Sequence, residues 1–430
     1  MGGFHHSGYR LNAIHYSAPP RSSGAYPMNI QAASTAGQAR EHEISAWMTV
    51  LLAAACGLIV ANLYYAQPLI GLIAADIGLP PSTASMIVAL TQIGYCAGLL
   101  LLVPLGDLTE NRRLISVTLG GVVLALLMAT LAPNAPLFLA AALLIGLCAV
   151  VVQMLVPLAA HMAPEGTRGR VVGNVMSGLL LGVMLSRPVS SLIAANFGWR
   201  AVFGASAVAM IALLVVLHNL LPLRRPAADH SYRELIGSLW ALLRDTPILR
   251  RRAAYQAALF GSFTLFWTIV PQVLSGPQFG FTQRGIALFA LSGAAGVFSA
   301  PIAGRMADRG WSRLGTGLSL GLVALGFAVA YFGAGGSVIM LMIGGILLDL
   351  GVQSNLVLGQ RAIYALGAHA RSRLTGLYMA LFFAGGAFGS SISSVVFIHG
   401  GWQSVCWIGV AFPLAAMLLY ATEFFGTAQR

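Results

Sequence analysis

Long apolar segments recur along almost the whole of this 430-residue chain, and short polar connections separate them. An α-helix needs about 20 mainly apolar residues to cross the hydrocarbon core of a bilayer. Twelve segments reach that length: about 45–70, 82–104, 114–132, 136–159, 170–194, 199–221, 252–275, 284–304, 314–333, 337–359, 373–396 and 402–423. The pattern predicts an all-α integral membrane protein with twelve transmembrane helices.

The longest polar break, 222–251, divides these segments into six and six. We expect a six-helix bundle at 44–221, a cytoplasmic linker at 222–251, a second six-helix bundle at 252–424 and a short cytoplasmic tail at 425–430. Residues 1–43 are polar, without apolar periodicity, which predicts a disordered cytoplasmic tail. Translation could instead begin at Met28, because nothing in residues 1–27 would order them.

The composition supports a membrane location. Only 8% of the residues are charged and 58% are hydrophobic, whereas soluble domains carry about 25% charged residues. Lipid must therefore be much of the solvent of this chain. All 24 basic residues are arginine, and they lie in short clusters between the apolar segments. A nucleic-acid-binding surface would gather them on one face, so the net charge of +12 does not indicate nucleic-acid binding.

The arginines also predict the orientation of the chain. Eighteen lie in the loops after the even-numbered segments and at the C-terminal end, whereas the opposite loops hold only Arg200 and Arg284. Loops rich in arginine stay in the cytoplasm. Both termini are therefore expected on the cytoplasmic side.

The two halves contain an internal repeat. Residues 168–202 align with 371–405 at a constant offset of 203, and ten of the 35 positions are identical. The shared pattern begins R-x-R-x-x-G-x-x-M and ends on Gly-Trp, at Gly198 and Gly401. The fifth segment therefore corresponds to the eleventh, in the same orientation. Secondary transporters are often built from such repeats, with the substrate path between them.

Two loops at equivalent places in the halves combine an acid with arginines: Asp107, Arg112 and Arg113 in the first, and Asp308, Arg309 and Arg313 in the second. Such a cluster could act as a cytoplasmic gate that latches neighbouring helices in one conformation. Alternatively, the arginines only keep the loop inside and the acid balances them, since exposed ion pairs contribute about 0–1 kcal/mol.

These motifs resemble those of the major facilitator superfamily. The loops 106–113 and 304–310 are similar to its signature loop and the echo of that loop, and the glycine-rich segment from Gly173 to Pro188 resembles a motif of its drug–proton antiporter branch. Val103, Leu108 and Arg187 depart from the usual motifs. The resemblance implies two six-helix repeats, transport by alternating access, proton-coupled efflux and a bacterial cytoplasmic (inner) membrane.

Asp349 is an acid near the middle of a transmembrane segment, where a charge costs about 2.5–3.5 kcal/mol. Gln353 is four residues later, so both side chains can face one cavity. A carboxyl group removed from water favours its neutral form, which would suit proton exchange. Asp349 is therefore a candidate for the coupling proton or for a cationic substrate. The alternative is an acid that only hydrogen bonds a neighbouring helix.

Arg187 lies in the outer third of the fifth segment, directly before Pro188. It could bind an anionic substrate, pair with Asp349 as a gate between the halves, or extend its side chain to the membrane surface.

Neutral polar residues on several segments complete the expected substrate and proton path: Asn62, Tyr65, Gln67, Gln92 and Gln153. Amide and phenol groups suit a pocket that orients a mostly apolar solute. Each of them alone could equally form a hydrogen bond between helices. Trp267 could line the pocket or pack against lipid.

The chain has no lysine and therefore no nucleotide-binding P-loop. Its cysteines and histidines match no metal-site spacing, and no nucleophile and base share a centre. We expect a monomeric secondary transporter that is not an enzyme, with no cofactor or metal, a small-molecule substrate, and protons as the coupling ion. The predicted function is efflux of small amphipathic molecules. The alternatives are an importer or facilitator of a small metabolite, which could be anionic, and a non-transporting membrane sensor.

Overall fold

The computed structural model describes residues 45–225, 231–333, 335–366 and 371–425. Every regular element in these ranges is a helix, so the predicted all-α fold is confirmed. The chain divides into two units, Met1–Glu43 and Ile44–Arg430, and all described elements belong to the second. The predicted tail at 1–43 and nearly all of the tail at 425–430 lie outside the described residues.

The helices of the first half follow one another as α1 (Ala46–Ala61), α2 (Ile70–Asp76), α3 (Met86–Leu101), α4 (Asn111–Leu131), α5 (Ala135–Cys148), α6 (Val151–Met162), α7 (Arg168–Phe197) and α8 (Trp199–Leu220). After the intervening helix α9 (Tyr232–Asp245), the second half contains α10 (Pro247–Ser275), α11 (Gln283–Ala290), α12 (Ser299–Asp308), α13 (Ser312–Gly333), α14 (Val338–Tyr364) and α15 (Arg371–Phe425).

Ten helical segments in the described part of the chain are long and apolar enough to cross a membrane. The last of them lies in α15, whose 55 residues are interrupted by a non-helical backbone at Gly401. That interruption divides α15 into two spans. With the shorter apolar helix α1, the architecture is consistent with twelve crossings.

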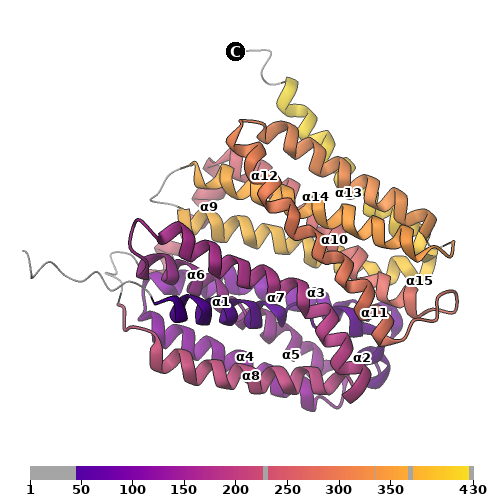
Figure 1. Ribbon diagram of the computed structural model, residues 1–430, viewed down its shortest axis with the longest axis horizontal. Coiled ribbons are helices and arrows are strands. Elements are labelled where there is room, and N and C mark those ends of the chain that lie inside the picture. The colour runs from indigo at the N-terminus through magenta and orange to yellow at the C-terminus, as the bar shows by residue number, and fades with distance from the viewer. Residues whose placement is uncertain (1–44, 226–230, 334, 367–370, 426–430) are drawn as a thin grey trace, which may run out of the picture. The chain divides into compact units, whose positions relative to one another are not determined.

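Within this unit, helices α1–α8 lie together and helices α10–α15 lie together (Figure 1). The halves meet where α3 packs against α15 and where α7 packs against α11. Large buried aromatic side chains from both halves fill the space between them, among them Tyr95 from α3 and Phe383 from α15, with ring centroids 4.4 Å apart. The side chains at this junction are therefore the candidates for a substrate site.

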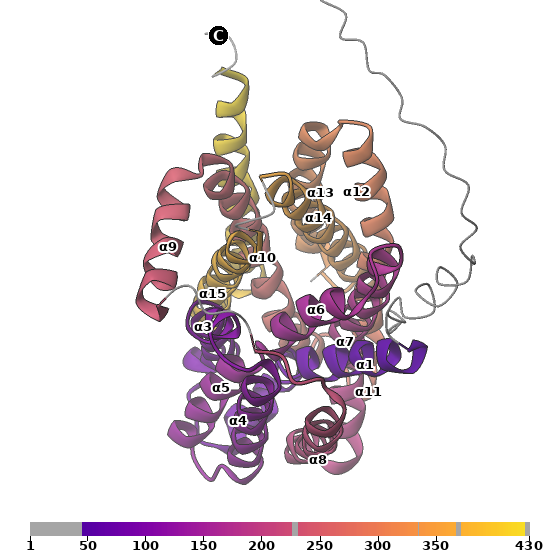
Figure 2. The ribbon, with the colours of Figure 1, turned by 90° about the vertical axis from the view of Figure 1, so that its left-hand side faces the viewer.

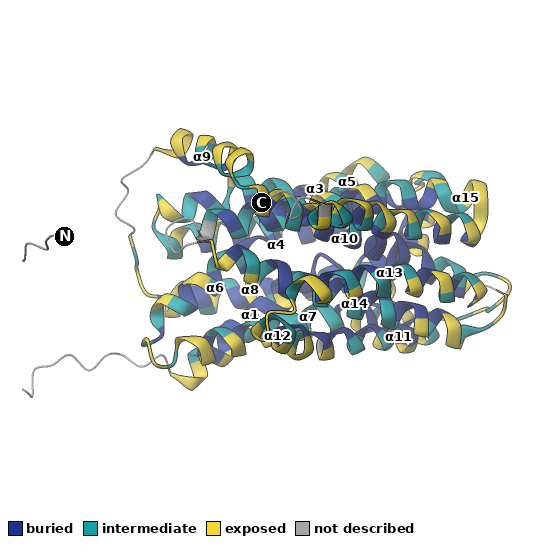
Figure 3. Ribbon diagram, turned by 90° about the horizontal axis from the view of Figure 1, so that it is seen from above, coloured by how far each residue is buried: buried dark blue, intermediate teal, exposed yellow. Residues whose placement is uncertain are grey.

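The outer faces of the helices are apolar. Helix α4 exposes Val117, Leu124 and Leu131 at seven-residue spacing, and α8 exposes Val208 and Val215 in the same way. Such exposed positions run along the outer sides of the helices (Figure 3). A helix at the surface of a soluble protein would present polar residues there, so these faces suit contact with hydrocarbon.

Three segments predicted as continuous helices are broken: 136–159 is interrupted at Ala149 and Val150, between α5 and α6, and two others break as follows. The segment 45–70 ends its first helix at Ala61 and resumes through a 3-10 helix at Gln67–Leu69. Asn62 donates to Leu58 O and Ile59 O, and Pro68 has no N–H to continue an α-helix. The segment 284–304 contains a 3-10 stretch at Leu291–Phe298 between α11 and α12. Both breaks lie beside the site described below.

The predicted linker 222–251 contains a helix, α9. Ser231 and Glu234 cap its first turn reciprocally, which stabilises the start of this helix. Helix α9 packs on α15, on α10 and on the 3-10 helix Val103–Asp107. Figure 2 shows α9 at the edge of the unit, beside α15. Helix α10 begins at Pro247, five residues before the predicted start.

The sequence repeat corresponds to a repeat in structure. Gly198 and Gly401 adopt positive φ angles of 80° and 63°, and each is followed by a buried tryptophan. The repeat also sets two helix crossings. A Cβ atom on Gly182 of α7 would overlap Gly57 O of α1, and a Cβ atom on Gly385 of α15 would overlap Ala257 O of α10. Equivalent helices thus approach closely in both halves, as small residues permit.

Candidate functional site

Arg187 of α7 is buried at the junction of the two halves, with 4% of its surface exposed. Three aromatic rings surround its guanidinium group: the Cζ atom is 5.2 Å from the ring centroid of Tyr64, 5.1 Å from that of Phe263 and 4.6 Å from that of Trp267. Tyr64 belongs to the first half, and the other two lie on α10. This burial excludes the alternative in which Arg187 extends to the membrane surface.

Gln67 is the hydrogen-bond partner of Arg187. The Arg187 Nε atom donates to Gln67 Oε1 at 2.8 Å. The break after α1 brings Gln67 to this position, because Gln67 begins the 3-10 helix that follows. Arg187 Nη2 and Gln67 Nε2 are both buried and have no hydrogen-bond partner among the described residues.

Asp349 of α14 is also buried, with 3% of its surface exposed. It accepts a hydrogen bond of 2.9 Å at Oδ1 from the indole Nε1 of Trp267. No ion pair joins Arg187 directly to Asp349 among the side chains that the structure describes. Trp267 therefore links the two charged groups, with Arg187 over its ring and Asp349 at its N–H edge.

The 3-10 stretch between α11 and α12 covers the other side of Asp349. A Cβ atom on Gly296 would lie 3.3 Å from Asp349 Cβ and 3.4 Å from Gln353 Cγ. A Cβ atom on Gly293 would lie 2.7 Å from Asp349 Oδ2, too close for an ordinary contact. Asp349 and Gln353 thus share one face of α14, and glycine at 293 leaves room for the carboxylate.

Asn62 and Tyr65 face a different neighbour. The Ser206 hydroxyl of α8 donates to Asn62 Oδ1 at 2.6 Å, and Asn62 Nδ2 lies 3.8 Å from Met210 Sδ. The side chain of Tyr65 also hydrogen bonds with that of Ser206. These two predicted path residues therefore join α1 to α8 rather than line the space around Arg187.

Gln92 and Gln153 form a third group, beside α15. Gln153 Nε2 donates to the Tyr95 hydroxyl at 3.1 Å. Gln92 is 1% exposed, and a Cβ atom on Gly386 would overlap its Oε1 atom. Gln92 lies at the α3–α15 contact, which is the other junction between the halves, and Gln153 of α6 is joined to it through Tyr95.

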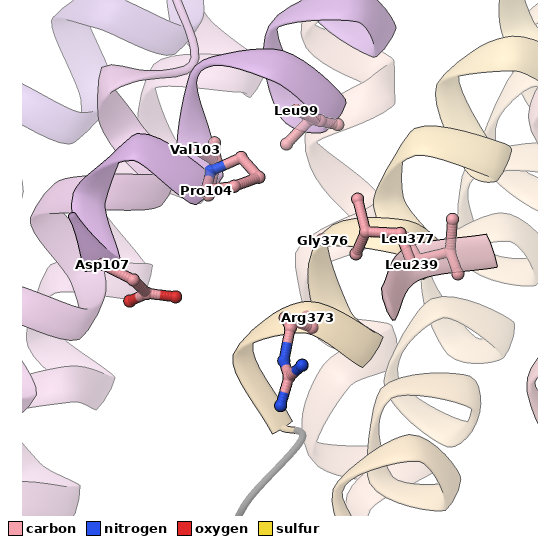
Figure 4. Close-up of a pocket in the computed structure, with 8 residues that line it drawn as sticks. All are labelled: Leu99, Val103, Pro104, Asp107, Leu239, Arg373, Gly376 and Leu377. Carbon is pink, nitrogen blue, oxygen red and sulfur yellow. The ribbon is translucent and has the colours of Figure 1, made fainter. Parts of the chain in front are cut away.

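The first acid–arginine cluster, Asp107, Arg112 and Arg113, forms no ion pair among the described side chains. Arg112 donates its backbone N–H to Glu110 at 2.9 Å, which caps α4, and Arg113 is exposed. Asp107 makes no ion pair with the described side chains. It lines a small pocket whose other wall carries Arg373 of α15 (Figure 4). Arg373 in turn donates to Ser238 of α9 at 3.0 Å.

The second cluster pairs with other helices. Asp308 forms an ion pair with Arg361 of α14, and Arg313 Nε lies 3.8 Å from Glu423 Oε2 of α15. The Cζ atom of Arg309 lies 5.5 Å from the ring centroid of Trp311. These contacts stay within the second half.

The sequence analysis did not identify four partners in these groups: Phe263, Arg361, Arg373 and Glu423. It left Trp267 undecided between the pocket and lipid, and the structure buries its ring, with 1% exposed. One signal was present, since Phe260, Phe263, Phe266 and Trp267 recur at helical spacing. Such spacing more often indicates packing than a site.

The central arrangement has a definite chemical capacity. The positive charge of Arg187 and the negative charge of Asp349 compensate each other across the indole ring of Trp267, which contacts both. The carboxyl group of Asp349 can take up or release a proton. Loss of the negative charge would leave the cation uncompensated in a medium of low dielectric constant, which is costly. The state of Asp349 is therefore coupled energetically to the packing around Arg187.

Comparisons with known proteins agree with this architecture. The family model described as Major Facilitator Superfamily matches residues 50–333 and 256–428. A transporter of Escherichia coli O157:H7 named YgaY is 42% identical over 383 residues, covering 88% of this chain and 96% of the relative. A transporter of Streptomyces coelicolor is 33% identical over 359 residues, covering 83% of each chain. The solved structure of the nucleoside transporter NupG superposes with a TM-score of 0.72 at 14% identity, covering 87% of this chain and 99% of that one, which is a likeness of fold.

Proposed function

The chain belongs to the Major Facilitator Superfamily, and from this premise we propose that it is a proton-coupled exporter of small amphipathic molecules. It works by alternating access, with the two six-helix halves rocking around a site between them. It acts as a monomer in the bacterial cytoplasmic membrane with both termini in the cytoplasm. The distribution of the arginines supports this orientation.

One observation carries the proposal: a cation of one half, Arg187, is held through Trp267 to an acid of the other half, Asp349. Protonation of Asp349 removes the negative charge that offsets Arg187. A buried cation without a compensating charge is costly in a medium of low dielectric constant. Proton uptake would therefore weaken the contact of Arg187 with Trp267, across which the halves must separate.

The surroundings of Arg187 support an amphipathic substrate. Tyr64, Phe263 and Trp267 offer flat apolar surfaces next to a small number of polar groups, as in many ligand pockets. The export direction rests on the glycine-rich segment from Gly173 to Pro188, which resembles that of drug–proton antiporters.

A second candidate is uptake of a small anionic metabolite. The unpartnered N–H donors of Arg187 and Gln67 favour it, since they would suit an anion.

The test uses everted membrane vesicles that carry an imposed pH gradient. Addition of a substrate from a broad panel should dissipate the gradient in wild-type vesicles and in the control Asp245→Asn, which changes an exposed acid at the end of α9. It should not do so with Asp349→Asn at matched expression. A normal response of Asp349→Asn would remove this acid from the coupling path. If no compound moves protons and right-side-out vesicles accumulate anions, the second candidate replaces the first.

A further inference from the structure

Two neighbouring N–H donors at the junction of the halves have no acceptor among the residues that the structure describes. Arg187 Nη2 and Gln67 Nε2 have no hydrogen-bond partner among the described residues, although the two residues are only 4% and 0% exposed. Native proteins rarely leave buried donors unpaired, and each such group calls for an explanation.

The two donors belong to one hydrogen-bonded pair of side chains. Arg187 Nε donates to Gln67 Oε1 at 2.8 Å. Nε and Nη2 form one edge of the planar guanidinium group, and a carboxylate binds such an edge through two parallel hydrogen bonds. Gln67 occupies only the Nε end of this edge with its carbonyl oxygen. The Nη2 end and the Gln67 amide group remain available to a second acceptor.

The rest of the guanidinium group is enclosed by aromatic rings. The ring centroids of Tyr64, Phe263 and Trp267 lie within 5.2 Å of Arg187 Cζ. The ring of Phe263 is stacked with that of Phe260, at 5.2 Å between centroids. An apolar body attached to an acceptor group would therefore find aromatic surface directly beside the donors.

Asp349 does not fill this role. Its carboxylate accepts from the N–H edge of Trp267, whereas Arg187 lies over the ring of the same indole. No ion pair of the described side chains joins Asp349 to Arg187. The described residues therefore supply no acceptor for these two donors.

We infer that this site binds the carboxylate of a small amphipathic organic acid. One oxygen accepts from Arg187 Nη2, the other accepts from Gln67 Nε2, and the apolar body packs against the aromatic rings. The inference rests on the proposed function in taking this junction as the substrate site, and it names the chemical class of that substrate.

Equilibrium binding tests it without flux or proton movement. Isothermal titration calorimetry on the purified full chain in lipid nanodiscs would compare 3-phenylpropanoate and octanoate with their primary amides, which keep the size and lose the charge. We expect the acids to bind at least about tenfold more tightly than the amides, as hydrogen bonds between charged groups are the stronger ones. Equal binding of acid and amide, or no binding of either acid, would overturn the inference.

Two variants locate the binding to this site. Arg187→Lys keeps the charge but not the planar fork, so we expect affinity to fall at least about tenfold. Gln67→Glu places a carboxylate of nearly the same shape beside Arg187, where it should occupy the edge, preserve the fold and abolish binding of added acids. Unchanged affinity in Gln67→Glu would refute the assignment, even if Arg187→Lys failed to fold.

Matched controls are available on the surface. Arg250→Gln and Gln403→Ala change exposed residues of the same types and should bind acids as the wild type does. Because binding is measured at equilibrium, a protein that binds acids but moves no protons would support this inference and contradict proton-coupled export. A protein that moves protons only with uncharged substrates would contradict this inference and support proton-coupled export.

Discussion

Replacement of Gly182 or Gly385 by alanine should loosen the same helix crossing in each half. A Cβ atom on Gly182 would lie 2.5 Å from Gly57 C, and one on Gly385 would lie 2.6 Å from Ala257 Cα. Ordinary contacts begin at 3.4 Å, so the helices must separate by at least about 0.8–0.9 Å. The atoms in the way are backbone atoms, which cannot rotate aside.

The energetic cost follows from that separation. A radial gap of about 0.5–1 Å forfeits a quarter to a half of the dispersion attraction between facing atoms. Overpacking a close contact costs about 1–3 kcal/mol, and we expect each of the two variants to lose that much stability. A change at one crossing also affects the surface on which the halves meet, so transport should fall with stability.

The repeat itself supplies the control. Gly173 and Gly376 are an equivalent pair on the same two helices, and a Cβ atom there would meet nothing within 4 Å. Gly173→Ala and Gly376→Ala should be neutral or stabilise the helix by up to about 1 kcal/mol. Thermal unfolding and a graded SDS titration of the purified proteins would measure all four. Equal stability of the four variants would show that the helix crossings do not depend on these glycines.

Three further outcomes are expected. Trp267→Phe keeps a ring near Arg187 but removes the N–H that donates to Asp349, a hydrogen bond worth about 1.5–3 kcal/mol. The transport rate in vesicles should therefore fall by about tenfold or more. A wild-type rate would argue against the role of Trp267 in linking Arg187 to Asp349. Asn62→Ala should lower thermal stability by about 1–3 kcal/mol through its lost buried hydrogen bonds while acid binding stays unchanged, and a selective loss of binding would return Asn62 to the substrate path. The Arg200 guanidinium holds the pKa of Asp76, which lies outside the membrane spans, below its ordinary value. This ion pair therefore stabilises the fold above about pH 4, and its contribution is lost as the pH falls further. Below that pH the melting temperature of the wild type should drop more steeply than that of Asp76→Asn, and parallel plots of melting temperature against pH would contradict this.

Much of the architecture was predictable from sequence because the membrane imposes it. A segment of about 20 apolar residues has to be helical in lipid, where its backbone groups find no water. Hydropathy therefore located the spans to within a few residues, and the identical Gly-Trp pairs at 198–199 and 401–402 indicated equivalent helices. Breaks at Asn62, at 149–150 and at 291–298 were missed, because a break of this kind does not change the hydropathy of its segment.

The site was only partly predictable. Arg187 and Asp349 stood out because buried charge is rare in a membrane span. Their relation did not follow, because Trp267 lies between them and a tryptophan among apolar residues is ordinary. Asn62 has the same polarity as Gln67 and lies five residues before it, yet it faces α8. Asp308 stood out as part of a charge cluster, but its ion pair with Arg361 of another helix did not follow from the sequence.

The sequence by itself determined the helices, their repeat and the two buried charges, because hydrophobicity and charge act on each segment independently of its neighbours. Only the tertiary structure decided which side chains meet. That depends on how each helix is rotated about its own axis, on where glycines let two backbones approach, and on where a helix breaks. Those choices brought Gln67 and Trp267 to Arg187, and they left Arg187 Nη2 and Gln67 Nε2 without a partner among the residues that the structure describes.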